Sequence, residues 1–243
     1  SCGFDSIPFD LGVLFLQAEA VKRHGKPAPR VKGRVRKMQG GASGGTIASL
    51  TETLKAVAKK PSLALLLKSS FAPTPGFEGP HQPSGLIPEY DHATGTWTAP
   101  FVMAPINTKN VHRTNFLLGH AWGADLVYDE MVMTTIGEAG KAMAEAMAKA
   151  NPFGESKLQP GEGPSKEERE NGFYDILFVG EYPDGTTIRV SVQGDRDPGY
   201  GSTSKMLAET GMTLLETDGA GGVWTPGALL GQASKEQYGA LDA

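Results

Sequence analysis

Cysteine is nearly missing from this sequence, because Cys2 is the only one among 243 residues. A single thiol excludes an internal disulfide framework and a zinc site built from thiolates. A chain with so little cysteine suits a reducing compartment. We therefore expect no disulfide and no metal site.

Long apolar runs are also missing. The longest one covers residues 63–67, far short of the ~20 apolar residues that a helix needs to cross a bilayer. No secretory signal pattern opens the sequence. We expect no transmembrane segment and a cytoplasmic or membrane-peripheral location.

A surplus of basic charge is the third absence. Lys and Arg number 23 against 27 Asp and Glu, which gives a net charge of -4 at pH 7 and a pI near 5.8. Proteins that bind nucleic acids neutralise the phosphates with a basic surface. The charge balance therefore argues against a nucleic-acid partner.

The composition is otherwise that of an ordinary globular protein, with 39% hydrophobic and 21% charged residues. A chain of this length can bury one sizeable core or two small ones. The 32 glycines and 17 prolines are spread along the sequence. They therefore punctuate many short elements and do not form one low-complexity block.

The first twelve residues are typical of a junction between a strand and a helix. Residues 1–4 are small or apolar, and Asp5 and Ser6 can cap a helix whose first turn holds Pro8. The helix is predicted to end at Gly25. Its apolar stripe is predicted at Ile7, Leu11, Leu14, Phe15, Ala18 and Val21.

A strand with one polar face is predicted at residues 31–38, where small or apolar residues alternate with basic ones. Lys32, Arg34 and Arg36 then share one side of the strand. This side is either a solvated surface or a stripe that faces phosphate, and the sequence leaves both interpretations open.

A glycine-rich loop follows at residues 40–46, before a helix predicted at 47–60. Glycines let a ligand approach the backbone, so the amides and the helix N-terminus can face an anion or a developing oxyanion. The loop has neither the G-x-G-x-x-G fingerprint of a dinucleotide-binding turn nor the lysine of a P-loop. A tight turn without ligand contact is the alternative.

The same loop matches the G-x-S-x-G pattern of a hydrolase nucleophile elbow from Gly41 to Gly45. Asp91 and then His112 or His120 follow in the order of a hydrolase triad. An elbow grows from a strand that is buried on both faces and is therefore continuously apolar. The basic residues of the preceding strand argue against a hydrolase.

The rest of the chain predicts helices and antiparallel strands. Residues 70–98 are expected to form a long loop, and residues 151–163 a linker. A strand is predicted at 125–134, and Pro183-Asp184-Gly185 is predicted to join two strands as a hairpin across 173–194. We predict an α+β (or α/β) fold with a mixed, largely antiparallel sheet covered by helices.

Three further groups carry candidate side chains. His112 can donate a proton and Arg113 can clamp a carboxylate or phosphate, although such a pair on a helix is commonly a surface feature. Tyr200 lies in a turn, where it can protonate an enolate or simply pack. Trp224 lies in a glycine-rich stretch that lines a cleft or turns a corner.

Four segments carry a family resemblance. They are C-G-F-D-S-I-P from Cys2, G-G-A-S-G-G-T from Gly40, H-R-T from His112 with the strand that contains Tyr128 and Glu130, and G-G-V-W-T-P at 221–226. Together they resemble the saccharopine dehydrogenase-like oxidoreductases, which include the trans-acting enoyl reductases of bacterial polyketide-lipid synthesis. The segments occur in the family's order and span most of the chain.

The resemblance implies that residues 1–231 are the substrate-binding and dimerisation domain of an NAD(P)-dependent oxidoreductase, with 232–243 as a C-terminal tail. It also implies a homodimer and an N-terminal dinucleotide-binding domain, absent from this chain, that binds most of the NADP or NAD. The reaction it implies is hydride transfer to a carbonyl-conjugated C=C bond or to a C=N bond.

The resemblance and the residue chemistry together suggest individual roles. Tyr200 and His112 are the predicted catalytic proton donors, and Gly3, Phe4 and Pro8 are predicted to contact the cofactor. The predicted substrate-binding residues are Asp5, Ser6, Ser43, Gly44, Gly45, Thr46, Arg113 and Trp224.

The expected substrate is a small molecule derived from an acyl group or an amino acid. Saccharopine would need a cluster of basic residues that the sequence lacks outside Arg113 and the basic strand, whereas Met and Pro residues at 70–106 suit an apolar acyl group. The alternative from a different class is a non-catalytic binding or assembly module. Exposed apolar residues on the strands at 125–134 and 173–194 would favour that alternative.

Overall fold

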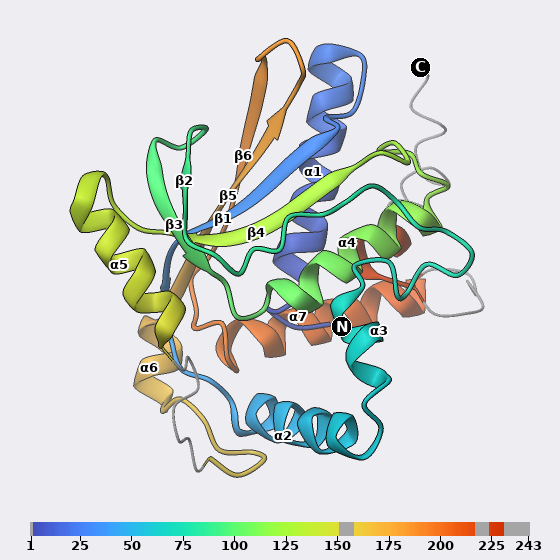
Figure 1. Cartoon of the computed structure of the whole chain (residues 1–243). Coiled ribbons are helices and arrows are strands. Elements are labelled where there is room, and N and C mark those ends of the chain that lie inside the picture. The colour runs from blue at the N-terminus through green and yellow to red at the C-terminus, as the bar shows by residue number, and fades with distance from the viewer. Residues whose placement is uncertain (1, 151–157, 217–223, 231–243) are drawn as a thin grey trace.

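The computed structural model describes residues 2–150, 158–216 and 224–230. They form one six-stranded sheet with helices packed against it (Figure 1), in the strand order β2-β3-β4-β1-β5-β6. All neighbouring strands are antiparallel except β1 and β4, which are parallel. The predicted α+β fold with a mixed, largely antiparallel sheet is therefore confirmed.

The elements have the following bounds. The strands are β1 Arg30–Gln39, β2 Glu89–Asp91, β3 Thr96–Pro100, β4 Val127–Met133, β5 Phe173–Glu181 and β6 Thr187–Gly194. The helices are α1 Ile7–His24, α2 Gly44–Lys59, α3 Leu63–Lys68, α4 Ala104–Leu117, α5 Gly137–Lys149, α6 Lys166–Asn171 and α7 Gly201–Glu216. None of the described helices is long and apolar enough to cross a membrane.

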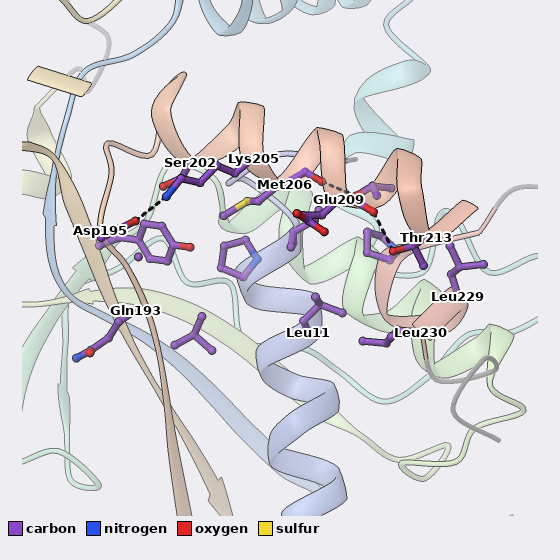
Figure 2. A pocket seen from close by; sticks show the side chains of 17 residues that line it. Leu11, Gln193, Asp195, Ser202, Lys205, Met206, Glu209, Thr213, Leu229 and Leu230 are labelled. Carbon is purple, nitrogen blue, oxygen red and sulfur yellow. Dashed lines mark hydrogen bonds and ion pairs between the residues drawn. The ribbon is translucent and has the colours of Figure 1, made fainter. Parts of the chain in front are cut away.

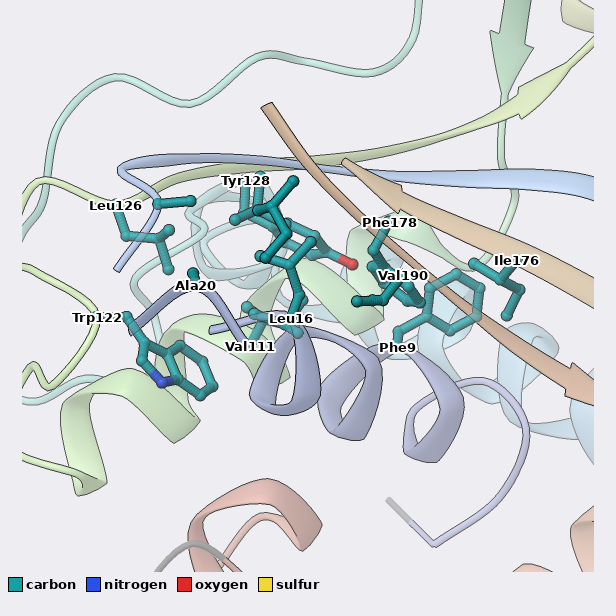
Figure 3. Close-up of a cluster of buried hydrophobic side chains, with 14 of the residues drawn as sticks. Phe9, Leu16, Ala20, Val111, Trp122, Leu126, Tyr128, Ile176, Phe178 and Val190 are labelled. Carbon is teal, nitrogen blue, oxygen red and sulfur yellow. The ribbon is translucent and has the colours of Figure 1, made fainter. Parts of the chain in front are cut away.

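The hydrophobic core lies between the sheet and the helices α1 and α4. α1 packs on β5 and β6, and α4 packs on α1 and β4. Because successive strand residues point to opposite faces, Val31 and Val35 of β1 enter this core while their basic neighbours do not. Figure 3 shows Phe9 and Leu16 of α1 meeting Phe178 of β5 in the same cluster.

α1 begins and ends as predicted, but it buries a different stripe. Phe15 and Val21 of the predicted stripe are 51% and 47% exposed. The prediction was wrong because α1 is apolar on two sides, and Ile7 and Leu11 line a cavity. The buried residues are Pro8, Phe9, Asp10, Gly12, Val13, Leu16, Gln17 and Ala20.

The loop predicted at 70–98 is shorter than expected. β2 and β3 form a hairpin in its last part, since the amide of Gly95 donates to Asp91 O and closes a tight turn. The segment before β2 covers part of the free edge of β4. There the side chain of Gln82 accepts from the amide of Tyr128 and donates to Leu126 O, as a paired strand would. The predicted linker at 151–163 lies partly outside the described residues.

The face of β1 opposite the core carries a network of ion pairs. Arg34 is fully buried, with Nε 2.6 Å from Asp91 Oδ2 and Nη1 2.8 Å from Asp129 Oδ2. Lys32 Nζ lies 3.1 Å from Asp91 Oδ1 and 3.0 Å from Glu181 Oε1. The network continues with the pairs Arg36–Asp175 and Arg30–Asp129.

These pairs explain the alternation of basic residues that the sequence shows. Burial opposes the charge on Arg34, but Asp129 and Asp91 outweigh it and raise the pKa of the guanidinium above its usual value. All three basic side chains are thus paired with carboxylates; Arg34 and Lys32 are largely buried, whereas Arg36 is 32% exposed. The predicted alternatives of a solvated surface or a phosphate-facing stripe are therefore wrong for Lys32 and Arg34.

Candidate functional site

A cavity of about 280 Å³ lies where four distant segments meet, and we call it the loop cavity. Its walls come from parts of residues 4–5, 38–46, 101–103 and 198–203. Five of the predicted site residues line it together, although up to ~200 positions of sequence separate them. They are Phe4, Asp5, Ser43, Thr46 and Tyr200.

Tyr200 is held in the loop cavity by a turn that Asp197 organises. The buried carboxylate of Asp197 accepts three backbone hydrogen bonds, from Gly199 at 2.8 Å, Tyr200 at 3.2 Å and Gly201 at 2.7 Å. This arrangement caps the start of α7. Sequence reasoning missed the role of Asp197, although an Asp before Pro and Gly is a known turn signal.

The glycine loop packs directly against that turn. A Cβ on Gly40 would lie 2.6 Å from Cδ of Pro198 and 2.8 Å from Cβ of Asp197, so only glycine permits the approach. Ser43 is the N-cap of α2, and its Oγ accepts from the amide of Thr46 at 3.2 Å. The hydroxyls of Ser43 and Thr46 lie 3.0 Å apart in the wall of the loop cavity.

Two amides of this loop already have protein acceptors. Gly44 donates to Glu162 O at 2.8 Å, and Thr46 donates to Ser43 Oγ. A Cβ on Gly44 would lie 1.8 Å from Gln159 O, so this glycine is needed for packing. Gly44 and Gly45 do not line the loop cavity. The loop therefore offers two hydroxyls to a ligand.

The hydrolase triad is not assembled. Asp91 accepts from Arg34, Lys32 and the amide of Ala93, and Ser43 caps a helix. The two candidate histidines pack in tilted geometry against aromatic rings of the 69–82 segment, with centroid distances of 4.6 Å for His112–Phe71 and 4.2 Å for His120–Phe77.

His112 and Arg113 lie away from the loop cavity. Met103 lines that cavity at the start of α4, and His112 follows nine residues later, about 13 Å along the helix. Burial lowers the pKa of His112 to about 4, so the ring is neutral at pH 7. Arg113 Nη1 donates to Pro73 O at 2.9 Å. Both residues thus hold the 69–77 segment on α4.

The remaining predicted residues are divided among several places. Ser6 Oγ accepts from Asn110 Nδ2 at 2.7 Å and so joins α1 to α4. Gly3 packs beside Thr203, since a Cβ added to Gly3 would lie 3.1 Å from the methyl group of Thr203. Pro8 lines a second cavity, and Trp224 lines neither cavity.

The second cavity is larger, about 420 Å³, and lies between α1, the end of the β5–β6 hairpin and α7 (Figure 2). Leu11, Met206 and Leu229 point into it from three elements. At its edge Lys205 Nζ and Asp195 Oδ1 form an ion pair at 2.8 Å. Its volume falls within the ~300–1,000 Å³ of small-molecule sites.

A buried carboxyl group fixes the segment at 224–230 beside this second cavity. Asp10 accepts from Thr114 Oγ1 at 2.5 Å and from the amide of Gly227 at 2.7 Å. Thr114 also contacts the hydroxyl of Thr225. Burial raises the pKa of Asp10 to about 6. Sequence reasoning missed this residue, whose signal is an acid on the buried side of an apolar helix.

Glu130 is a second buried carboxyl group, on the core face of β4. Its Oε1 accepts from the hydroxyl of Tyr128 and its Oε2 from Asn107 Nδ2, each at 2.8 Å. Burial raises the pKa of Glu130 well above its usual value. The strand that resembles the family is thus tied to α4 by polar contacts inside the core.

The loop cavity is too small for a complete dinucleotide. The loop cavity is near the lower limit for small ligands, and the amides of Gly44 and Thr46 have protein acceptors. The predicted cofactor contacts Gly3, Phe4 and Pro8 are not gathered in one cavity.

Comparison with known proteins finds similar proteins but no matching family model. No protein-family model and no solved structure matches this chain. The sequence is 34% identical over 266 residues to a Mycobacterium tuberculosis protein named "Putative trans-acting enoyl reductase", a match that covers 98% of this chain and 64% of that protein. It is 29% identical over 269 residues to the trans-acting enoyl reductase of Mycobacterium ulcerans, covering 96% of this chain and 63% of the relative.

A trans-acting enoyl reductase of Mycobacterium bovis BCG is 28% identical, with the same coverage. The chain thus spans less than two thirds of the length of these relatives. Their names agree with the enoyl reductase part of the predicted resemblance. Over nearly its whole length, this chain is similar to proteins named trans-acting enoyl reductases.

Proposed function

We propose that this chain is the substrate-binding part of an NAD(P)-dependent enoyl reductase, an oxidoreductase that transfers hydride to a C=C bond conjugated to a carbonyl. The loop cavity carries the proposal, because it joins Phe4, Ser43 and Tyr200 from three of the segments predicted to form a site. The names of the relatives support the reaction class and favour C=C over C=N.

The cofactor is proposed to be NADPH or NADH, bound mainly by residues outside this chain. The small volume of the loop cavity supports this division. When bound, the nicotinamide supplies the hydride. The residues of this chain hold and orient the acceptor.

Tyr200 is the proposed proton donor. After hydride addition to the β-carbon of the substrate, the α-carbon must take a proton, and the phenol of a tyrosine can supply it. The hydroxyls of Ser43 and Thr46, 3.0 Å apart, are proposed to stabilise negative charge on the carbonyl oxygen. Asp197 acts as a positioning residue, since it holds the backbone on which Tyr200 sits.

An apolar acyl compound is the proposed substrate class. Phe4, Met38 and Phe101 contribute apolar wall to the loop cavity. Basic side chains that would hold a dicarboxylate are absent from its described lining. The proposal therefore favours an acyl group over saccharopine.

The assembly-module alternative has less support. Among the large apolar residues of β4, β5 and β6, all described, only Phe173 is exposed, at 36%. These strands thus present little apolar surface to a partner. A homodimer and a cytoplasmic location stay proposals, and sedimentation equilibrium at several protein concentrations tests the dimer.

Replacing Tyr200 by Phe tests the reaction in the full-length natural protein. With an enoyl thioester and NADPH, we expect kcat to fall by about 10²–10⁴ while KM changes little, because only the proton donor is lost. Tyr90→Phe is the matched control, since Tyr90 is exposed on β2 and lines neither cavity. Equal turnover by Tyr200→Phe and the control would remove Tyr200 from this role.

A fluorescence titration of the 243-residue chain with NADPH and NADH tests whether the cofactor is bound mainly outside this chain. We expect no saturable binding by the folded chain. Saturable binding that Gly40→Val abolishes would make the loop cavity a nucleotide site, and the proposal that the cofactor is bound mainly outside this chain would be wrong.

A further inference from the structure

The helices α2 and α3 form an arm that extends from the body of the molecule (Figure 1). We define the α2–α3 arm as residues 44–68. α2 packs chiefly against α3, and no residue of α3 is buried. The arm exposes five leucines to solvent. They are Leu50 at 39%, Leu54 at 60%, Leu65 at 72%, Leu66 at 56% and Leu67 at 47%.

The arm is also basic, although the whole chain is acidic. It contains Lys55, Lys59, Lys60 and Lys68 but only one acid, Glu52, so its net charge is +3, against -4 for the chain. Lysines that flank exposed leucines are typical of helices that lie in the interface of an anionic bilayer.

α2 separates these two kinds of side chain along its length. Leu50 and Leu54 are four residues apart and so lie on one side of the helix. Lys55 and Lys59 are also four residues apart, on a different side. All four side chains are exposed. This is the amphipathic pattern of a helix that lies in the plane of a membrane surface.

α3 distinguishes a bilayer from a protein partner. Leu65, Leu66 and Leu67 are consecutive, so they project over an arc of about 200° around the helix. A protein groove receives one stripe of residues spaced three or four apart. The acyl region of a bilayer accepts apolar side chains from any side, which suits three adjacent exposed leucines.

The attachment of α3 to the body leaves this surface free. Lys109 of α4 donates to Leu67 O at 2.8 Å through its Nζ, and this contact uses the backbone of α3. The leucine side chains remain available. Near this contact, Ile106 of α4 is 47% exposed and extends the apolar surface beyond the arm.

We propose that the α2–α3 arm binds the surface of an anionic lipid bilayer. The leucines enter the boundary between headgroups and acyl chains, and the lysines contact the lipid phosphates. Because α2 begins at the loop cavity, with Thr46 in its wall, the bound arm places that cavity close to the membrane surface. The proposal does not depend on the proposed reaction, since it concerns binding alone.

Co-sedimentation with vesicles tests the proposal on the 243-residue chain. We expect the chain to pellet with vesicles of phosphatidylcholine and phosphatidylglycerol, and to stay in solution with phosphatidylcholine alone. Binding should weaken as salt rises, because salt screens the lysines. No binding to the anionic vesicles would overturn the proposal.

Two variants separate the apolar and the electrostatic parts. Leu66→Asp/Leu67→Asp is expected to reduce binding at least tenfold, whereas Leu215→Asp, at an 82% exposed leucine on α7, should bind like the wild type. Lys59→Gln/Lys60→Gln is expected to reduce binding about 30-fold, since each lysine near an anionic surface contributes about a fivefold effect. Circular dichroism checks that each variant is folded.

Self-association is the competing explanation for exposed leucines. Sedimentation velocity without vesicles measures it in the wild type and in Leu66→Asp/Leu67→Asp. A wild-type dimer that the double variant disrupts, together with no vesicle binding, would assign the arm to a second copy of the chain and overturn the proposal. Wild-type binding by the folded double variant would also overturn it.

Discussion

Gly12 shows how one residue sets the distance between a helix and a strand. Glycine is unfavourable inside a helix by about 1 kcal/mol relative to alanine, yet it lies in the middle of α1. A Cβ there would be 2.3 Å from the ring of Phe178 on β5, closer than any real contact. The absence of a side chain therefore lets α1 pack closely on the sheet.

Adding a methyl group at residue 12 tests whether the missing side chain permits this close packing. Gly12→Ala is expected to lower the free energy of unfolding by about 1–3 kcal/mol, because the methyl group overpacks the core. Gly211→Ala in α7 is the control, since a Cβ there meets nothing within 4 Å, and it should stabilise the protein by up to about 1 kcal/mol. Urea unfolding measures both, and shifts of the same sign would contradict the explanation.

Single residues of the candidate site were predictable where a local motif marked them. Ser43, Thr46 and Tyr200 come from glycine-rich turns, and the structure brings them to one cavity. Asp10 was not predictable, because its partners Thr114 and Gly227 lie 104 and 217 positions away. A local sequence pattern cannot indicate contacts between residues so far apart in the chain.

Among the elements, β1 depends most on partners elsewhere in the chain. Arg34 is fully buried between Asp91 of β2 and Asp129 of β4. Removing one member of a buried ion pair leaves an uncompensated charge, which costs more than the pair contributes. The three residues therefore act as one unit.

Arg34→Met is expected to destabilise the protein by about 3–5 kcal/mol, because two buried carboxylates lose their common partner. Adding Asp91→Asn and Asp129→Asn to this variant should recover part of the loss, since the two carboxylates no longer face an apolar side chain, while Lys32 keeps its pair with Glu181 and Arg30 is partly exposed to solvent. Chemical unfolding of both variants gives the comparison. A triple variant as unstable as Arg34→Met alone would refute the electrostatic explanation.

The elements themselves were partly predictable from the sequence. The β5–β6 hairpin follows from Pro183-Asp184-Gly185, where Gly185 adopts a φ of 83°. β2 was missed because three residues are too short for a periodic pattern. The buried stripe of α1 was missed because its apolar residues serve both the core and the second cavity.

For the molecule as a whole, two buried groups give opposite dependences of stability on pH. His112 has a pKa of about 4 in the fold against an ordinary 6.5. Between these values the unfolded chain binds a proton on His112 that the folded chain does not bind. The free energy of unfolding therefore falls as pH falls from 6.5 to 4. The pKa of Asp10 is raised from 3.8 to about 6, so the fold binds a proton that the unfolded chain lacks, and this group makes the protein more stable as pH falls from about 6 to 3.8.

His112→Phe is expected to keep the packing on Phe71 and to remove the first of these effects. Relative to the wild type, it should gain up to about 3 kcal/mol of stability when the pH is lowered from 7 to 4. His81→Phe, at an exposed histidine, should follow the wild type. Urea midpoints at several pH values measure this, and parallel curves for His112→Phe and the wild type would contradict it.

The central position of β1 has a consequence for how the chain acquires its fold. Its parallel neighbour β4 lies far along the sequence, since Val127 is 97 positions after Arg30, and its antiparallel neighbour β5 lies farther still, since Asp175 is 139 positions after Arg36. A ribosome adds about 5–20 residues per second, so roughly 5–20 s pass between the synthesis of β1 and the synthesis of β4, its first neighbour. Such long-range pairing makes folding slow, and chaperones have that interval in which to hold the nascent strand.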